Sequence, residues 1–191
     1  PLSPAQDYKR AFDGDEGPNT GGMGAYSPLP WLPEGFVDEV IDTIAVPTVR
    51  QLASEHTPVI GLLYCVLILT RQGIRVIEFN ARFGDPEAMN VLSILSSSFT
   101  AVCRNIVDGT LSASQVSFQR KATVCKYVVP RGYGTKSEAG KEIKVDEKGI
   151  EKEGAQLYYA MVNEENGRIV TTTSRAAGVV GIDDTLEGAE Q

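Results

Sequence analysis

The sequence predicts an α+β protein, in which helical and extended segments alternate irregularly along the chain. Three observations carry this prediction: an amphipathic helical pattern over residues 36–55, two apolar segments at residues 61–70 and 75–80, and a change to strand-like patterns after residue 121. The polar residues 110–120, just before the strand-like patterns begin, predict a crossing between two domains. We therefore expect one domain over residues 1–112 and a smaller α+β domain over residues 113–191, whose end is missing.

The first half of the chain predicts a loop, a helix and a hairpin in that order. Residues 1–35 are dense in Gly, Pro, Asn and Asp, so we expect a structured loop rather than a regular element. Residues 36–55 predict one helix, with a break or kink at Pro47 because proline has no N–H to donate. The next two apolar segments predict buried strands that pair across the turn Arg71–Ile74.

The second half predicts two short helices and then mostly strands. The helices are expected over residues 86–95 and 99–108, and Gly109 closes the second. Beyond residue 121 the expected elements are strands over residues 122–129, 157–163, 168–173 and 177–182 and a final helix from residue 185. The middle two strands flank Glu165-Asn166-Gly167, whose Asn-Gly pair favours a hairpin turn.

Composition and charge narrow the class of protein. The chain has 191 residues, 42% hydrophobic and 23% charged, as in ordinary globular proteins. The net charge of −7 disfavours nucleic acid or an anionic membrane as the main partner, because both favour a basic surface. No apolar run has transmembrane length. The chain begins with proline rather than methionine, so we expect it to be a piece of a longer polypeptide.

Cysteine and histidine usage argues against several kinds of site. Cys65, Cys103 and Cys125 are isolated in apolar surroundings, which predicts reduced, buried thiols in a cytoplasmic protein. The single histidine, His56, makes a Ser-His-Asp triad or a histidine-rich zinc site improbable.

The segment over residues 76–87 carries the strongest chemical pattern. It begins as a strand, where side chains alternate between faces, so Glu78 and Asn80 are expected on one face. A carboxylate and an amide oxygen together suit a hard cation such as Mg²⁺. Arg82 and Asp85 follow, and a cation, an arginine and carboxylates are the groups that phosphoryl transfer requires. The alternative is a buried strand that ends in a surface salt-bridge cluster.

A glycine-rich segment lies upstream, over residues 19–24. Its three glycines allow backbone N–H groups to converge on an anion or allow a ligand to approach the backbone closely. Asp7, Lys9 and Arg10 precede it and bring a carboxylate beside two cations. Taken alone, such glycines serve turns more often than they bind ligands.

Taken in order, the segments Pro4–Arg10, Asp13–Tyr26 and Glu78–Glu87 resemble the phosphoribosylamine–glycine ligase family, also called glycinamide ribonucleotide synthetases, of the ATP-grasp superfamily. The resemblance continues more weakly through Thr123–Tyr133 and Thr171–Ala177, so it covers nearly the whole chain. It implies the second half of an ATP-grasp domain, with an antiparallel sheet and helices, followed by a small α+β C-terminal domain. It also implies an N-terminal domain of the same enzyme as a missing partner, and a monomer or dimer.

The resemblance implies a reaction in purine biosynthesis. ATP phosphorylates the carboxylate of glycine, and the amine of 5-phosphoribosylamine attacks the resulting acyl phosphate to give glycinamide ribonucleotide, ADP and phosphate. It assigns Mg²⁺ or Mn²⁺ to Glu78 and Asn80 and places Arg82 on the transferred phosphoryl group. Asp85 would orient Arg82 or the amine. The residues that would hold glycine and the ribosylamine are Asp7, Lys9, Asn19, Thr20, Gly21, Gly22, Met23 and Gly24.

Two departures keep other interpretations open. Some relatives have Gln at the position of Val66, as an additional metal ligand, and valine cannot coordinate a metal. The missing N-terminal domain implies that this chain alone is a partial site and inactive. The alternatives are another ATP-grasp carboxylate–amine ligase, or a non-catalytic nucleotide-binding module of the same fold.

Overall fold

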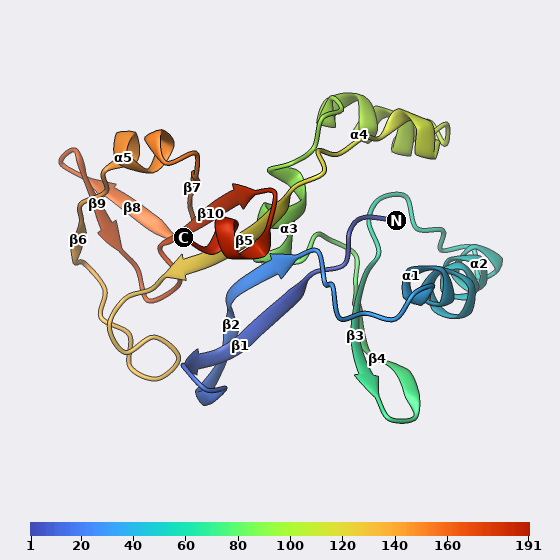
Figure 1. Cartoon of the computed structure of the whole chain (residues 1–191), viewed down its shortest axis with the longest axis horizontal. Helices are drawn as coiled ribbons and strands as arrows, with labels where there is room; N and C mark the ends of the chain where they lie inside the picture. The colour runs from blue at the N-terminus through green and yellow to red at the C-terminus, as the bar shows by residue number, and fades with distance from the viewer. The chain divides into compact units, whose positions relative to one another are not determined.

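The computed structural model describes all 191 residues, and the chain divides into two compact units (Figure 1). The first unit comprises Pro1–Pro4, Pro30–Gly84 and Leu95–Gln119, and the second comprises Ala5–Leu29, Asp85–Ile94 and Arg120–Gln191. The units are interleaved along the chain. A domain boundary at residue 112 stays a prediction. Each unit is described by itself below.

The second unit is built on a five-stranded antiparallel sheet. Its strand order is β1-β2-β5-β10-β7, where the strands are β1 (Gln6–Phe12), β2 (Glu16–Ser27), β5 (Ala122–Val128), β10 (Ala177–Asp183) and β7 (Gln156–Tyr159). Figure 1 shows the blue strands β1 and β2 continuing into the sheet made by β5 and β10. All four pairings are antiparallel, as the family resemblance implies.

The prediction of a loop over residues 1–35 is wrong, because β1 and β2 occupy most of that region. Pairing with β5 outweighs the low strand propensity of the glycines. Gly24 lies opposite Lys126, and a Cβ added at Gly24 would collide with the carbonyl oxygen of Cys125. This glycine therefore permits the close backbone approach that joins β2 to the rest of the sheet.

Helix α3 (Glu87–Leu92) packs on this sheet through a buried asparagine. Asn90 is fully buried, and its Nδ2 donates to the carbonyl oxygens of Ala25 at 2.9 Å and Thr123 at 3.1 Å. One side chain thus ties the helix to both β2 and β5. Small and apolar residues fill the surrounding core, namely Ala25, Ala122, Cys125, Ala176, Ala177 and Val180.

A three-stranded antiparallel sheet completes the second unit. Its order is β6-β9-β8, with β6 (Glu142–Ile143), β9 (Arg168–Thr171) and β8 (Val162–Glu165), and the unit also contains α5 (Glu147–Lys152) and α6 (Leu186–Glu190). The hairpin predicted around Asn166 and Gly167 is confirmed, since both residues have positive φ and Glu165 pairs with Arg168. The expected single strand over residues 157–163 is wrong: it is divided between β7 and β8, which lie in different sheets. The sequence also missed α5 and β6.

The helical part of the first unit runs without the predicted break. Helix α1 (Phe36–Val40) continues through a π-helical turn over Ile41–Ala45 into α2 (Val46–Ser54). Pro47 is the second residue of α2 and directly follows the wider turn, whose altered hydrogen bonding accommodates a residue without an N–H inside the continuous helix. The unit also contains α4 (Phe99–Val107), whose first turn is capped by Ser98, and a short 3₁₀ turn over Ala113–Gln115.

The predicted hairpin of the first unit is confirmed as β3 (Tyr64–Thr70) paired with β4 (Gly73–Asn80). The expectation that these strands are buried is wrong. Ile77 is 61% exposed and Phe79 40% exposed, because β3 and β4 form a sheet of only two strands. The cysteines also differ from expectation, since Cys103 is exposed while Cys125 is buried. None of the helices has the length and apolarity needed to cross a membrane.

Candidate functional site

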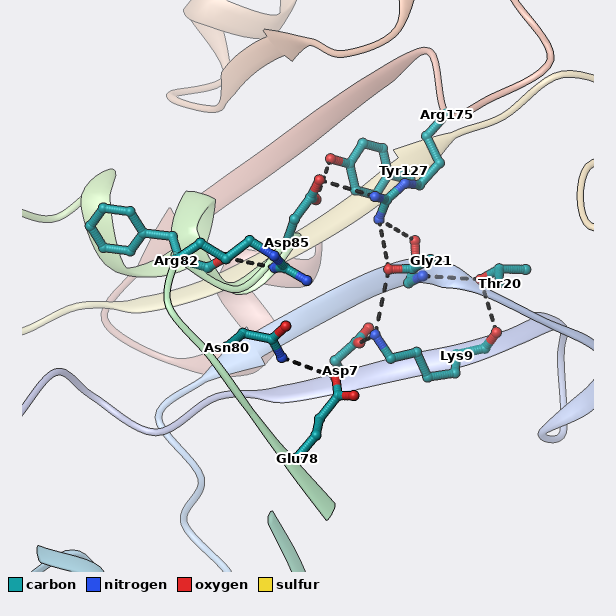
Figure 2. A network of polar contacts seen from close by, with 12 residues as sticks. Asp7, Lys9, Thr20, Gly21, Glu78, Asn80, Arg82, Asp85, Tyr127 and Arg175 are labelled. Atoms are coloured by element: carbon teal, nitrogen blue, oxygen red, sulfur yellow. Dashed lines mark hydrogen bonds and ion pairs between the residues drawn. The ribbon is translucent and has the colours of Figure 1, made fainter. Parts of the chain in front are cut away.

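The predicted metal residues lie together at the end of β4. Asn80 Nδ2 donates to Glu78 Oε1 at 3.0 Å, so the two side chains meet on one face of the strand, as the alternation along a strand predicts (Figure 2). Val66 on β3 is the direct cross-strand partner of Glu78, and Tyr64 is that of Asn80. The face around Glu78 is therefore flanked by an apolar side chain rather than by a third oxygen ligand.

The chemistry of these two donors fits a divalent cation. Mg²⁺ uses one or two carboxylates and fills its other positions with water and phosphate oxygens. Glu78 supplies the carboxylate, and a half-turn of the Asn80 amide would present its oxygen in place of its nitrogen. No group of three or more His, Cys, Asp or Glu side chains is placed to hold a metal. Glu78 and Asn80 would thus supply two of the metal ligands, and water and phosphate oxygens would supply the others.

Arg82 follows the pair on the same unit. Its Nη1 donates to the carbonyl oxygen of Phe83 at 2.9 Å, and the side chain is exposed. The remaining predicted residues, including Asp85, belong to the second unit. The structure therefore brings the predicted site residues together as two groups, one in each unit.

In the second unit, β1 and β2 place charged and polar groups around one buried carboxylate. Asp7 forms an ion pair with Lys9, and only 8% of the Asp7 side chain is exposed. Burial raises the pKa of Asp7; the hydrogen bond from Lys9 opposes this shift, and the negative charge of Glu87 adds to it. The Thr20 hydroxyl donates to the Lys9 carbonyl at 2.8 Å and accepts from the Gly22 N–H at 3.1 Å.

Gly22 lies so near the buried carboxylate that it leaves no room for a side chain. Its φ is +119°, and a Cβ added there would lie 2.8 Å from Asp7 Oδ1 and 2.8 Å from Pro86 Cδ. Only glycine fits both this backbone conformation and this packing. Gly22 therefore couples β2 to Asp7 and to the segment that leads into α3.

Arg175, which the sequence reasoning did not single out, connects the parts of this second group (Figure 2). Its Nη1 donates to the carbonyl oxygens of Gly21 and Gly22, each at 3.0 Å, and its Nη2 pairs with Asp85 Oδ2 at 3.0 Å. The guanidinium lies 4.5 Å from the centre of the Tyr127 ring. Tyr127 in turn donates to Asp85 Oδ1 at 2.6 Å, and its pKa is raised by burial and by this hydrogen bond.

Three predicted residues take little part in this network. Asn19 is exposed and lies opposite Arg10, Met23 is half-buried, and Gly24 serves the pairing with β5. The one signal in the sequence for Arg175 was its place in the weakly resembling segment Thr171–Ala177.

Comparison with known proteins identifies the class first. The family model described as the ATP-grasp (A) domain of phosphoribosylglycinamide synthetase matches residues 1–88. A crystal structure of phosphoribosylamine–glycine ligase from Thermotoga maritima superposes with a TM-score of 0.85 and 30% identity, covering 98% of this chain and 46% of that one. The fold is that of an ATP-grasp protein, as the resemblance implied.

The particular family follows from the rest of the chain. The model of the C domain of phosphoribosylglycinamide synthetase matches residues 123–191. A phosphoribosylamine–glycine ligase of Methanococcus vannielii is 50% identical over the whole chain, which spans 44% of that relative's length. One from Leifsonia xyli is 50% identical over 99% of this chain and 46% of its own length. The chain belongs to the phosphoribosylglycinamide synthetase family, of whose curated members it spans somewhat less than half.

Proposed function

We propose that the full-length polypeptide containing this chain ligates glycine to 5-phosphoribosylamine with consumption of ATP, as a step of purine biosynthesis. The observation that carries the proposal is the 50% identity along the entire chain to a relative named for this reaction. The Glu78–Asn80 pair and the network around Arg175 support it, because both offer the charges that phosphate and amine substrates need.

The reaction needs two displacements and no side-chain nucleophile. A carboxylate oxygen of glycine attacks the γ-phosphorus of ATP, and ADP leaves with the electron pair of the broken bond. The amine nitrogen of phosphoribosylamine then attacks the carbonyl carbon of the glycyl phosphate. The carbon–oxygen bond breaks, the amine loses a proton, and inorganic phosphate leaves with an oxygen that came from glycine.

The residues of the first unit would serve the phosphoryl transfer. Glu78 and Asn80 would hold Mg²⁺ or Mn²⁺, which when bound neutralises charge on the ATP phosphates. Arg82 is exposed and makes only a hydrogen bond to the neighbouring Phe83 carbonyl, so its guanidinium is available to a phosphoryl group. Its positive charge would stabilise the oxygens of the transferred group.

The residues of the second unit would hold the two acceptor substrates. Lys9 is half-exposed beside the buried Asp7, and the Asn19–Gly24 segment follows on β2. We assign this surface to glycine and the ribosylamine. Asp85 is held by Arg175 and Tyr127, and we give it the role of orienting the amine or Arg82.

We place the reaction in the cytoplasm, in a monomer or dimer, and the rest of the ATP site on the part of the polypeptide that this chain does not contain. The three free cysteines agree with a reducing compartment. The greater length of the relatives agrees with a site completed elsewhere on the polypeptide.

The first experiment tests the metal residues in the full-length enzyme. Glu78→Gln should abolish Mg²⁺-dependent ADP formation with glycine and phosphoribosylamine, since an uncharged amide replaces the only carboxylate of the pair. Glu34→Gln, which removes the same charge from an exposed position in the first unit, is the matched control and should keep full activity. Turnover of Glu78→Gln at the wild-type rate would contradict the assignment.

A second experiment tests the acid substrate. ADP formation should require glycine when a panel of amino acids and other small carboxylic acids is supplied with phosphoribosylamine. Activity with another acid but none with glycine would identify a different carboxylate–amine ligase. Heat on titrating Mg²⁺-nucleotide into the full-length protein, without ADP formation from any acid of the panel, would instead support a non-catalytic nucleotide-binding module.

A further inference from the structure

We propose that Arg175 is a positioning residue. It fixes the backbone conformation of the Gly-rich segment Thr20–Met23 of β2 and holds the Asp85 carboxylate beside that segment. The activity side of this inference rests on the proposed function. The structural side stands on the geometry of the second unit alone.

The Gly-rich segment Thr20–Met23 forms a large bulge in the β1–β2 ladder. Tyr8 pairs with Gly24 and Arg10 pairs with Asn19, so the four residues from Thr20 to Met23 all stand opposite Lys9. Residues in such a bulge lack regular cross-strand partners, and bulges are common next to active sites. The backbone of this segment therefore needs other groups to fix its conformation.

Arg175 supplies hydrogen-bond donors that fix this backbone, although it lies far from the segment in the sequence. The carbonyl oxygens of Gly21 and Gly22 both accept from its Nη1 at 3.0 Å. Gly21 and Gly22 have no side chains that could anchor the segment. Apart from Arg175, Lys9 Nζ donates to the Gly21 carbonyl at the longer distance of 3.5 Å, and the Thr20 hydroxyl bonds the Lys9 carbonyl and the Gly22 N–H. Without Arg175 the two glycines would regain conformational freedom that glycine, more than other residues, can use.

A closed ring of contacts fixes the guanidinium itself. Arg175 pairs with Asp85, Asp85 accepts from Tyr127, and the Tyr127 ring lies against the guanidinium. The Arg175 side chain is only 14% exposed, so the ion pair with Asp85 is shielded on the arginine side. A planar guanidinium can donate to three acceptors while stacking on a ring, whereas a lysine ammonium cannot reproduce that geometry.

The first test measures amide hydrogen exchange in the full-length protein. Arg175→Met should accelerate exchange in the segment 19–24 by about tenfold, which corresponds to about 1.4 kcal/mol, while β5 and β10 keep their protection. Arg168→Met removes an exposed arginine that pairs with Glu142 in the other sheet and is the matched control. Arg175→Lys is a second variant that keeps the positive charge and disturbs folding less. It should also accelerate exchange in the segment 19–24, because a lysine ammonium cannot reproduce the geometry of the guanidinium. Unchanged exchange in both Arg175 variants would overturn the proposal.

The second test separates positioning from direct contact with a substrate. If Arg175 acts through Asp85 and the bulge, the loss in kcat/KM for Arg175→Met combined with Asp85→Asn should be close to that of Arg175→Met alone. Losses that multiply would mean that Arg175 acts independently of Asp85, and would overturn the proposal. Failure of the wild-type enzyme to form ADP with glycine and phosphoribosylamine would refute the proposed function, and the exchange experiment would still decide the role of Arg175.

Discussion

Replacing Gly22 by alanine should destabilise the second unit more than Gly14→Ala, the same substitution at a glycine where only the backbone is strained. A φ of +119° is strained for an L-residue, at a cost of about 1–3 kcal/mol. The new Cβ would also lie 2.8 Å from both Asp7 Oδ1 and Pro86 Cδ, and overpacking of this kind costs about 1–3 kcal/mol. The two effects together give about 2–6 kcal/mol.

Gly14→Ala separates the two contributions. Gly14 has a φ of +73° and nothing within 4 Å of an added Cβ, so only the backbone cost of about 1–2 kcal/mol applies. Equilibrium urea unfolding followed by far-ultraviolet circular dichroism gives both free energies. A free-energy loss for Gly22→Ala no larger than that for Gly14→Ala would refute the packing of Gly22 against Asp7 and Pro86.

Three further predictions concern stability and reactivity in the second unit. Asn90→Leu should lower the free energy of unfolding by about 1–3 kcal/mol, because it leaves buried carbonyl groups without the donor they have in the native protein, and urea unfolding measures this. Burial raises the pKa of Cys125 to about 12, so at pH 8 only about one Cys125 thiol in ten thousand is the reactive thiolate. Iodoacetamide should therefore label the exposed Cys103 long before Cys125, as measured by peptide mass mapping. Equal labelling of the two cysteines in the folded protein would argue against the burial of Cys125. The raised pKa of Asp7 means that the fold favours its protonated form, so Asp7 contributes best at low pH and this contribution is lost as the pH rises through the folded-state pKa. Asp7→Asn should therefore be at least as stable as the wild type at pH 7, and this advantage should disappear as the pH falls below the ordinary pKa of 3.8. If the stability of Asp7→Asn relative to wild type were instead lower at pH 7 than at pH 4, folding would lower the pKa of Asp7 rather than raise it.

The elements that depend on local pattern were predictable from the sequence. The β3–β4 hairpin, the turn at Asn166-Gly167 and the helices α3, α4 and α6 follow from alternation, turn residues and caps. Strands β1 and β2 were not predictable in this way, because the glycines and the proline of β2 favour loops locally and β1 pairs only with β2. Strand β2 forms through pairing with β5, about a hundred residues away in the chain, and β1 then pairs with β2.

The two groups of site residues show the same division. Glu78 and Asn80 were found because their spacing alone places them on one face of a strand. Arg175 was missed because its partners Gly21 and Gly22 lie 154 and 153 positions away, so no local pattern marks it. The exposure of Ile77 and Phe79 was missed for a related reason, since an apolar strand pattern does not state how many strands cover it.

The fate of the glycine carboxylate oxygens tests the central claim most directly. Full-length enzyme is supplied with ATP, phosphoribosylamine and glycine whose carboxylate carries heavy oxygen, and the released phosphate is analysed by mass spectrometry. Ligation through glycyl phosphate predicts one heavy oxygen in each phosphate released and one retained in the amide product. Phosphate free of label, with amide formed, would contradict the account.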